Sequence, residues 1–421
     1  MKRDAFVYIP KSVYSEFDAI APLILELSRQ NNKIYTFVFS DKVMPVIADS
    51  VLHRKIFLES SEVVSFVPTK FKTMLLLTNI SRFIAISRFA FKIIGLRFRH
   101  SSIYVLTRWR SKGKNQGLKN NLLLRLIIAS VRIAGGKIYS VPGIQAPLTK
   151  PLLERLSPEG AKKMSKLEKR AKGQEIVVRQ NDWDKIVFSD EHEQFLKSQS
   201  GVTNKIYNVG IPRLYPSWQA HVKRYGQIDY EETLKELKVP PSNKKVITIL
   251  VTNPDYVWFK KSHDFYKLFE EAIQSIRLRF PDNVIFVKAK HNLFEIFENH
   301  QIFKTANDIY LYKRSLASLA SHSLFCLSIA ESSGIFDFLC NDVPVIEYSD
   351  YNADYLNVFP SINPWKGTPG FFICHDVNSL KRILEKVYDR KIICSCENLV
   401  THFKHRENVR ILLDNRTKNE V

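Results

Sequence analysis

A short run of small polar residues, between a predicted strand and a predicted helix, has the composition of an anion-binding turn. Residues 324–328 are apolar enough for a buried strand, and residues 335–339 have a helical pattern. Ser332, Ser333 and Gly334 lie between them. Backbone N–H groups at the start of a helix lack intrahelical partners and carry partial positive charge, so this turn could bind a phosphate or a diphosphate. The alternative is that a serine here only caps its own helix.

A second cluster combines cations with an imidazole. Residues 284–287 predict another strand, and Lys288, Lys290 and His291 follow it. At the carboxyl end of a strand these groups could bind the phosphates of a donor and stabilise charge on a departing nucleotide. The alternative for His291 is a structural role, which is common for a single histidine at a strand end.

Three further polar residues could belong to the same kind of site. Thr252 and Asn253 follow the predicted strand 246–251, where they could contact a donor or an acceptor, or form an ordinary turn before a helix. Arg213 follows the Gly-Ile-Pro sequence of residues 210–212, which predicts a tight crossing. Its guanidinium could bind a phosphate through two hydrogen bonds, or pair with a surface carboxylate.

Apolar runs separated by helical patterns indicate the elements that position these residues. Such alternation favours parallel sheets with crossover helices. The predicted strands are residues 5–10, 34–39, 101–106, 137–141, 185–188, 246–251, 284–287, 324–328 and 343–348. We therefore predict an α/β protein with two doubly wound, Rossmann-like domains, and a ligand cleft between the carboxyl ends of their strands.

The domain boundaries follow from a charged helical stretch that ends at two prolines, Pro240 and Pro241. Residues 1–228 are predicted to form an N-terminal, acceptor-side and membrane-facing domain, and residues 229–245 a linker. Residues 246–400 are predicted to form a C-terminal, nucleotide-donor-binding domain. Residues 401–421 are expected to form a C-terminal helix and a polar tail.

The positive charge of the chain is concentrated in one segment. The formal net charge is +21, and residues 63–153 contain 16 Lys and Arg but no Asp or Glu. On a helix, Arg88, Lys92 and Arg99 share a stripe opposite Phe83 and its apolar neighbours, which is typical of a basic segment lying on anionic lipid. The alternative is a core helix with one solvated basic edge. The membrane-facing candidates are Arg88, Lys92, Arg97 and Arg99.

Several classes of protein are disfavoured by what the sequence lacks. It contains no Gly-x-Gly-x-x-Gly, Walker or Gly-x-Ser-x-Gly motif, and no spaced His and Cys set for zinc. Asp182 and Asp184 precede their strand, so no metal and no cofactor is predicted. Nucleic acid is a less favoured partner because no binding motif accompanies the charge. The five cysteines, the absence of a signal peptide and the absence of a membrane span favour a cytosolic protein.

The order of three motifs resembles that of the CDP-glycerol and CDP-ribitol phosphotransferases of teichoic-acid and capsule synthesis. Residues 210–213 (Gly-Ile-Pro-Arg) are similar to the family's Gly-x-Pro-Arg, and residues 288–291 (Lys-Ala-Lys-His) to its Lys-Pro-His segment. Residues 332–338 (Ser-Ser-Gly-Ile-Phe-Asp-Phe) resemble its Ser-Ser-x-x-Phe-Asp-Phe, and residues 342–348 its following strand. The resemblance covers residues 185–348.

The resemblance implies a GT-B fold, with the donor held mainly by the C-terminal domain. It also implies that His291, Ser332 and Ser333 bind the donor phosphates. Glu331 differs from the residue usual in the family and is a second catalytic candidate beside His291. Members of the family usually act at the membrane on lipid-linked or polymeric acceptors.

The chain departs from this family in the N-terminal domain. The family carries a His-Gly-Thr-Pro-Leu-Lys segment whose histidine is a candidate base, whereas Pro142 occupies that place here. Proline cannot accept a proton, so another group serves as the base, the acceptor is already ionised, or the chain shares only the donor half of the site. Gly143 and Gln145 follow Pro142 and are the acceptor-side candidates.

These features predict a transferase of bacterial surface-polysaccharide synthesis. It would move a glycosyl or polyol-phosphate group from a CDP-, CMP- or UDP-linked donor to a membrane-associated glycan, at the inner face of the cell membrane. One alternative is a nucleotide-sugar epimerase of the same fold. Another is a non-catalytic protein that binds glycan or nucleic acid.

Overall fold

The computed structural model divides the chain into two compact units. Unit 1 comprises residues 1–146, 170–218 and 406–421, and unit 2 comprises residues 147–169 and 219–405. The boundary between the units falls within helix α9 (Pro216–Glu236). The predicted linker, residues 229–245, starts inside the same helix. The described residues are 3–10, 14–67, 75–107, 127–141, 184–188, 193, 197, 205–240, 245–252, 262–289, 293–330, 332, 334–349, 367–392, 394–402 and 409–412.

Unit 1 is built on a seven-stranded sheet in which the described strand pairs are parallel. The strand order is β3-β2-β1-β4-β5-β6-β7, so the order reverses between β1 and β4. Ala5 pairs with Lys33 on one side and with Ile103 on the other. The strands are β1 (Ala5–Ile9), β2 (Lys33–Val38), β3 (Glu62–Ser65), β4 (Ile103–Thr107), β5 (Lys137–Ser140), β6 (Asp184–Val187) and β7 (Ile206–Asn208).

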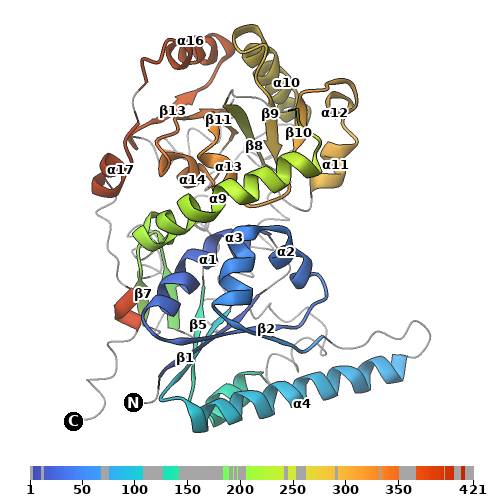
Figure 1. Cartoon of the computed structure of the whole chain (residues 1–421), viewed down its shortest axis with the longest axis vertical. Coiled ribbons are helices and arrows are strands. Elements are labelled where there is room, and N and C mark those ends of the chain that lie inside the picture. Colours follow the sequence, from blue (N-terminus) through green and yellow to red (C-terminus); the bar gives the residue numbers. More distant parts are fainter. Residues whose placement is uncertain are drawn as a thin grey trace, which may run out of the picture. The chain divides into compact units, whose positions relative to one another are not determined.

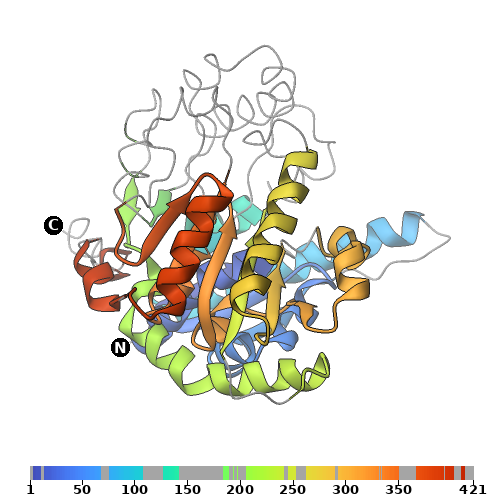
Figure 2. The same cartoon turned by 90° about the horizontal axis from the view of Figure 1, so that it is seen from above.

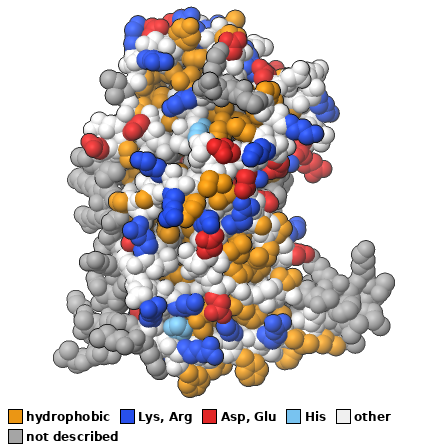
Figure 3. Space-filling view, in the orientation of Figure 1, with side chains coloured by type: hydrophobic (Ala, Val, Ile, Leu, Met, Phe, Trp, Pro, Cys, Tyr) orange, Lys and Arg blue, Asp and Glu red, His pale blue; other side chains and the backbone are white. Residues whose placement is uncertain are grey.

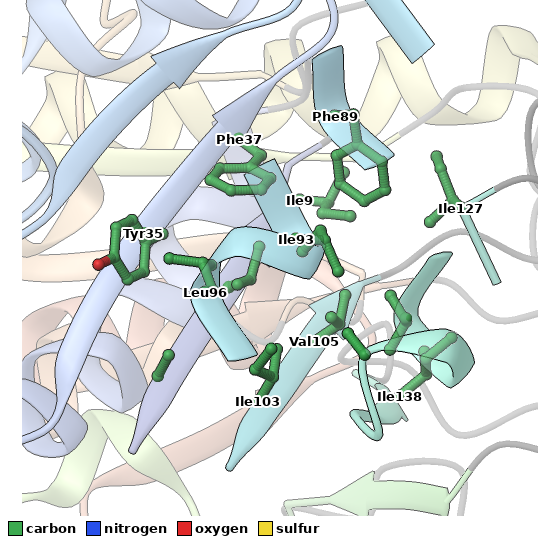
Figure 4. Packing of buried hydrophobic residues seen from close by; sticks show 14 of the residues in the cluster. Ile9, Tyr35, Phe37, Phe89, Ile93, Leu96, Ile103, Val105, Ile127 and Ile138 are labelled. Atoms are coloured by element: carbon green, nitrogen blue, oxygen red, sulfur yellow. The ribbon is translucent and has the colours of Figure 1, made fainter. Parts of the chain in front are cut away.

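Helices cover both faces of this sheet (Figure 1). Because side chains alternate along a strand, β1 directs Val7 towards α4 (Leu75–Arg99) and Tyr8 towards α1 (Tyr14–Arg29). Figure 4 shows Phe89, Ile93 and Leu96 of α4 packed against the sheet. The remaining elements of the unit are α2 (Val43–Asp49), α3 (Val51–Arg54), the π-helix η1 (Lys55–Glu59), helical residues 127–133, and the 3₁₀ helices η2 (Pro212–Leu214) and η4 (Val409–Leu412).

Unit 2 contains a six-stranded sheet whose described strand pairs are also parallel. The order is β10-β9-β8-β11-β12-β13, which reverses between β8 and β11. The strands are β8 (Val246–Val251), β9 (Ile285–Lys288), β10 (Ile309–Leu311), β11 (Ser323–Ile329), β12 (Val345–Tyr348) and β13 (Phe371–Cys374). Numbered from β8, this is the 3-2-1-4-5-6 order of a doubly wound, dinucleotide-binding sheet.

Helices α10 (Ser262–Arg279) and α16 (Val377–Tyr388) lie side by side over one face of this sheet (Figure 2). Arg279 joins them, since its guanidinium lies 3.2 Å from Glu385 and over the ring of Tyr388. The other described helices of the unit are short: α11 (Phe294–Glu298), α12 (Gln301–Thr305), α13 (Leu316–Ala320), α14 (Ile335–Leu339) and α17 (Cys396–His402).

Lys185, in β6, is a buried lysine that leads to a pH-dependent prediction. Burial lowers its pKa to about 8, although neighbouring Asp184 acts in the opposite direction. An unfolded lysine titrates near pH 10.4. The unfolded chain therefore binds more protons at this site between these values, and stability should rise with pH through that window. Below pH 8 the cost of burying the ammonium is present in full.

We therefore expect Lys185→Met to stabilise the protein at pH 7 by on the order of 1–3 kcal/mol, and the gain to shrink at about pH 10. Thermal unfolding of both proteins at the two pH values measures this difference. Lys197→Met is the matched control, because Lys197 is exposed and pairs with Glu193. If Lys185→Met stabilises the protein equally at both pH values, the effect is due to packing and the prediction is wrong.

Candidate functional site

The candidate site lies where the strand order of unit 2 reverses. β8 and β11 are neighbours there, and Val251 pairs with Ile329 at their carboxyl ends. The residues that follow, Thr252 and Ala330, are therefore brought to the same edge of the sheet. Ligands of doubly wound sheets bind at such a point, because the connections on either side of it lead to opposite faces. The topology thus places the two predicted donor-binding segments at one switch point.

Thr252 and Ser349 present buried hydroxyl groups at the carboxyl ends of β8 and β12. Thr252 is 3% exposed and Ser349 is fully buried. Among the described residues, none forms a hydrogen bond with Thr252 Oγ1 or with Ser349 Oγ. A buried hydroxyl without a partner costs about 1–3 kcal/mol, so these two hydroxyl groups are expected to have a partner when a ligand is bound.

The backbone around Ser349 is held firmly. Its N–H donates to the Cys374 carbonyl at 3.0 Å, and its carbonyl oxygen lies 3.0 Å from His375 Nδ1. Burial raises the pKa of the Cys374 thiol to about 12, so this group is neutral at pH 7. The backbone of Ser349 is therefore tied to the strand that carries this neutral thiol.

The turn after β11 is shaped by its own hydrogen bonds. Ala330 has a φ of 61°, and its carbonyl oxygen accepts a 2.6 Å hydrogen bond from Ser328 Oγ. Ser332 Oγ accepts a 3.2 Å hydrogen bond from the Gly334 N–H, within the turn before α14. The N-cap of α14 is Gly334, and among the described residues no side chain caps this helix. Helix α14 has only five residues. Glu331 and Ser333 lie outside the described residues.

The space around Gly334 is filled by leucine side chains. A Cβ atom at this position would lie 2.6 Å from Leu316 Cδ1 and 3.3 Å from Leu250 Cδ1. The turn is therefore pressed against α13 and β8, which fixes its backbone close to the end of β8.

Lys288 was predicted to bind the donor, but the structure turns its side chain inward. Its ammonium donates to the carbonyl oxygens of Lys313, at 3.2 Å, and of Arg314. It also lies over the rings of Phe294 and Tyr312. The charge of Lys288 thus organises the segment after β10, and we leave it out of the proposed site. Lys290, His291 and Asn253 lie outside the described residues.

The remaining predicted residues belong to unit 1. Arg213 is in η2 and is 5% exposed, so its side chain is buried. Tyr215 supports the same turn by donating a 2.5 Å hydrogen bond to the Val209 carbonyl oxygen. The acceptor-side candidates Gly143 and Gln145 lie outside the described residues.

Ser349 and His375 were not predicted from the sequence. Ser349 directly follows the predicted strand 343–348, so the rule that placed Thr252 at the sheet edge would also have found it. His375 follows β13, a strand that the sequence did not predict. That histidine could not have been assigned to the edge without the structure.

The described residues contain no group of three or more His, Cys, Asp or Glu arranged to hold a metal ion. No described helix is both long and apolar enough to cross a membrane.

Comparison with known proteins gives matches in structure only. No protein-family model matches the sequence, and no curated protein matches it. The UDP-GlcNAc 2-epimerase from Neisseria meningitidis, bound to UDP-GlcNAc, is similar with a TM-score of 0.53 and 12% identity, over 99% of this chain and 100% of that one. A glycosyltransferase from Rickettsia africae ESF-5 has a TM-score of 0.51 and 12% identity, over 100% of both chains.

A plant protein completes this set. Arabidopsis thaliana UGT89C1, complexed with UDP, has a TM-score of 0.51 and 11% identity, over 98% of this chain and 99% of that one. At these identities the likeness shows the fold, while the resemblance to the CDP-glycerol and CDP-ribitol phosphotransferases stays a prediction. The chain is an α/β protein with the GT-B fold, two Rossmann-like domains that are each built on a parallel sheet, as the sequence predicted.

Proposed function

We propose that unit 2 binds a nucleotide-linked donor and that the protein transfers a glycosyl or polyol-phosphate group from it to a membrane-associated glycan. One observation carries the proposal: Thr252 has a buried hydroxyl with no hydrogen-bond partner among the described residues, and it follows β8 at the switch point, where Val251 pairs with Ile329. A site that keeps a polar group buried without a partner among the described residues is prepared for a polar ligand.

The structural neighbours support the nucleotide part of the proposal. One was solved with UDP-GlcNAc and another with UDP. They share the fold with this chain, and ligands of that fold bind at the carboxyl ends of its strands. We therefore propose a pyrimidine nucleoside diphosphate, of the UDP or CDP type, as the carrier, with a CMP-linked donor as the remaining possibility.

Each residue of the site has a proposed role. The amides of Ser332 and Ser333 would bind the donor phosphates, while the Gly334 N–H donates to Ser332 Oγ and shapes the turn. Thr252 would donate its hydroxyl hydrogen to the donor. Lys290 and His291 would stabilise negative charge on the departing nucleotide. We propose that these cations suffice without a metal or a cofactor.

Glu331, Asn253 and Ser349 would complete the edge around the donor. Glu331 would act as the second catalytic group beside His291, and Asn253 would line the same edge after Thr252. The general base for the acceptor is not assigned, since proline stands at position 142.

An epimerase of the same fold is the second candidate function. It is favoured by the structural similarity to the UDP-GlcNAc 2-epimerase of Neisseria meningitidis. The two functions differ in the number of substrates, because an epimerase changes its donor without an acceptor. Incubation with the donor alone, followed by product analysis, separates them: an epimerised sugar supports the second candidate and excludes the first.

We expect UDP or CDP to raise the thermal unfolding midpoint, because a ligand that binds only the folded state stabilises it. Ser332→Ala should lower the midpoint without ligand, because it removes the hydrogen bond from the Gly334 N–H to Ser332 Oγ, which is worth about 1 kcal/mol. If Ser332 also binds phosphate, the variant should lose part of the nucleotide-induced rise as well.

The control for Ser332→Ala is Ser379→Ala on α16, whose hydroxyl lies 2.6 Å from Asp376 at an exposed helix start. That variant should keep the full nucleotide-induced rise. If no uridine or cytidine nucleotide shifts the midpoint of the unaltered protein, the donor assignment is wrong and the non-catalytic alternative is favoured.

A further inference from the structure

Helix α4 has an apolar face on each of two opposite sides. Its inner face belongs to the core of unit 1, where Ala85, Phe89, Ile93 and Leu96 are buried against the sheet. These residues recur at the three- and four-residue spacing of a single helix face. This inner face accounts for the packing of α4.

The outer face of α4 carries large apolar side chains that the core does not use. Phe91 is 77% exposed, Phe98 is 75% exposed and Phe83 is 66% exposed. Ile80 and Ile84 are also exposed on this helix. A single exposed apolar residue is ordinary in a soluble protein, but five on one helix form a patch, and such patches mark interaction surfaces. We call these five residues the outer face of α4.

The direction of the outer face follows from helix geometry. Successive residues of an α-helix are rotated by about 100°. Ile80, Phe91 and Phe98 therefore project to nearly one direction, which is roughly opposite to the mean direction of the buried residues. Ile84 and Phe83 project to either side of it. The apolar strip therefore points directly away from the sheet of unit 1.

Arginines border this strip. Arg88, Arg97 and Arg99 are exposed, with Arg88 and Arg99 on one flank and Arg97 on the other. Lys92 is different, because its ammonium lies 2.8 Å from Glu62 Oε1 and 5.7 Å from the ring centre of Tyr35. Lys92 was predicted to face a membrane, but it is engaged in an ion pair with β3, and we leave it out of the outer face.

The surface view agrees with this arrangement. Hydrophobic and basic side chains lie together along the lower edge in Figure 3, where Figure 1 places α4. The chain supplies no acidic residue between positions 62 and 154 to neutralise the arginines.

We propose that the outer face of α4 docks on an anionic lipid bilayer, with its phenylalanines among the acyl chains and its arginines among the headgroups. An apolar strip edged by cations fits the interfacial region of a bilayer. This surface would bring the enzyme to its membrane-associated acceptor, and that role rests on the proposed function. The docking itself rests on the outer face of α4 alone.

A second copy of the chain fits this surface less well. A two-fold dimer would place the same strip and the same arginines of both copies against each other. Three cations from each side would then meet without carboxylates from the segment to offset them, which is unfavourable. Anionic lipid supplies the opposite charge, so the bilayer is the occupant that the charges favour.

The test is co-sedimentation of the full chain with vesicles, without nucleotide. We expect binding to vesicles of phosphatidylcholine mixed with phosphatidylglycerol, and much less to phosphatidylcholine alone. Phe91→Ser/Phe98→Ser should weaken binding to the anionic vesicles roughly ten-fold or more, because two inserted rings are lost. Arg88→Gln/Arg99→Gln should weaken it about five-fold per residue and reduce the preference for anionic lipid.

Leu278→Ser is the matched control, because Leu278 is also 77% exposed but lies on α10 of unit 2. This variant should bind vesicles like the unaltered chain. Equal binding to neutral and anionic vesicles, or unaltered binding by Phe91→Ser/Phe98→Ser, would overturn the proposal. So would a dimer, detected by light scattering without vesicles, that Phe91→Ser/Phe98→Ser converts to a monomer.

Nucleotide-induced thermal stabilisation of Phe91→Ser/Phe98→Ser separates this proposal from the proposed function. The variant should keep the full rise, because the donor residues are on another unit. Loss of vesicle binding with the nucleotide effect intact supports the docking surface. Vesicle binding by a chain that no nucleotide stabilises would support docking while refuting the donor site.

Discussion

Thr252→Val should weaken nucleotide binding roughly ten- to a hundred-fold while leaving the unliganded protein at least as stable as before. Valine has the shape of threonine without the hydroxyl. Thr252 Oγ1 is buried and has no hydrogen-bond partner among the described residues, so removing it breaks no hydrogen bond to any of them. The lost interaction would be one made only with the ligand.

Calorimetry with the stabilising nucleotide measures the affinity, and thermal unfolding without nucleotide measures the stability. Thr248→Val is the matched control in the same strand. Thr248 Oγ1 lies 2.8 Å from Ser323 Oγ in the core, so its loss should cost about 1 kcal/mol and leave nucleotide affinity unchanged. Unaltered affinity in Thr252→Val would remove this residue from the donor site.

The nine predicted strands all overlap observed strands, whereas four of the described strands were missed. The missed strands β3, β7, β10 and β13 have only three or four residues each. Several of their side chains are half-buried. Their apolar runs are therefore too short, and too often interrupted by polar residues, to show the two-residue period of a strand. The buried central strands, with continuous apolar runs, identified the fold class because they are covered on both faces.

The location of the site was more predictable than its hydrogen bonds. The placement of Thr252 at the end of β8 and of the Ser332 turn at the end of β11 follows from strand ends alone. The inward direction of Lys288 depends on carbonyl oxygens supplied by residues 313 and 314. These carbonyl oxygens are more than twenty residues away in the chain, and no local pattern reports them.

The buried side of helix α4 could not be predicted from the sequence pattern either. The sequence placed Phe83 opposite the cations, on a face that would contact lipid or, in the alternative, the core. Phe83 is 66% exposed, and the core is formed by Phe89 and its neighbours. Apolar residues occur on both sides of this helix, so periodicity alone could not tell which side is buried. The sheet decides, because only one side of α4 can pack on it.

Arg314→Met should destabilise the protein by about 3–5 kcal/mol, which is the largest stability effect that we expect. Arg314 follows β10, and its guanidinium lies 3.0 Å from Glu232 and 2.9 Å from Glu236 on α9. It also lies 3.7 Å from Asp229, which is fully buried. Methionine would keep much of the packing but would leave the buried Asp229 carboxylate without its arginine counter-charge.

The double variant Asp229→Asn/Arg314→Met tests this cause. If the buried charge is responsible, removing it should restore part of the lost stability, so the two changes should not be additive in thermal unfolding. Lys391→Met is the control for an exposed ion pair, because Lys391 and Asp389 are both solvent-exposed and the midpoint should not move. Helix α9 carries the chain from unit 1 into unit 2, and the ammonium of Lys288 donates to the carbonyl oxygen of Arg314. An additive result would mean that Arg314 stabilises α9 by packing rather than by charge.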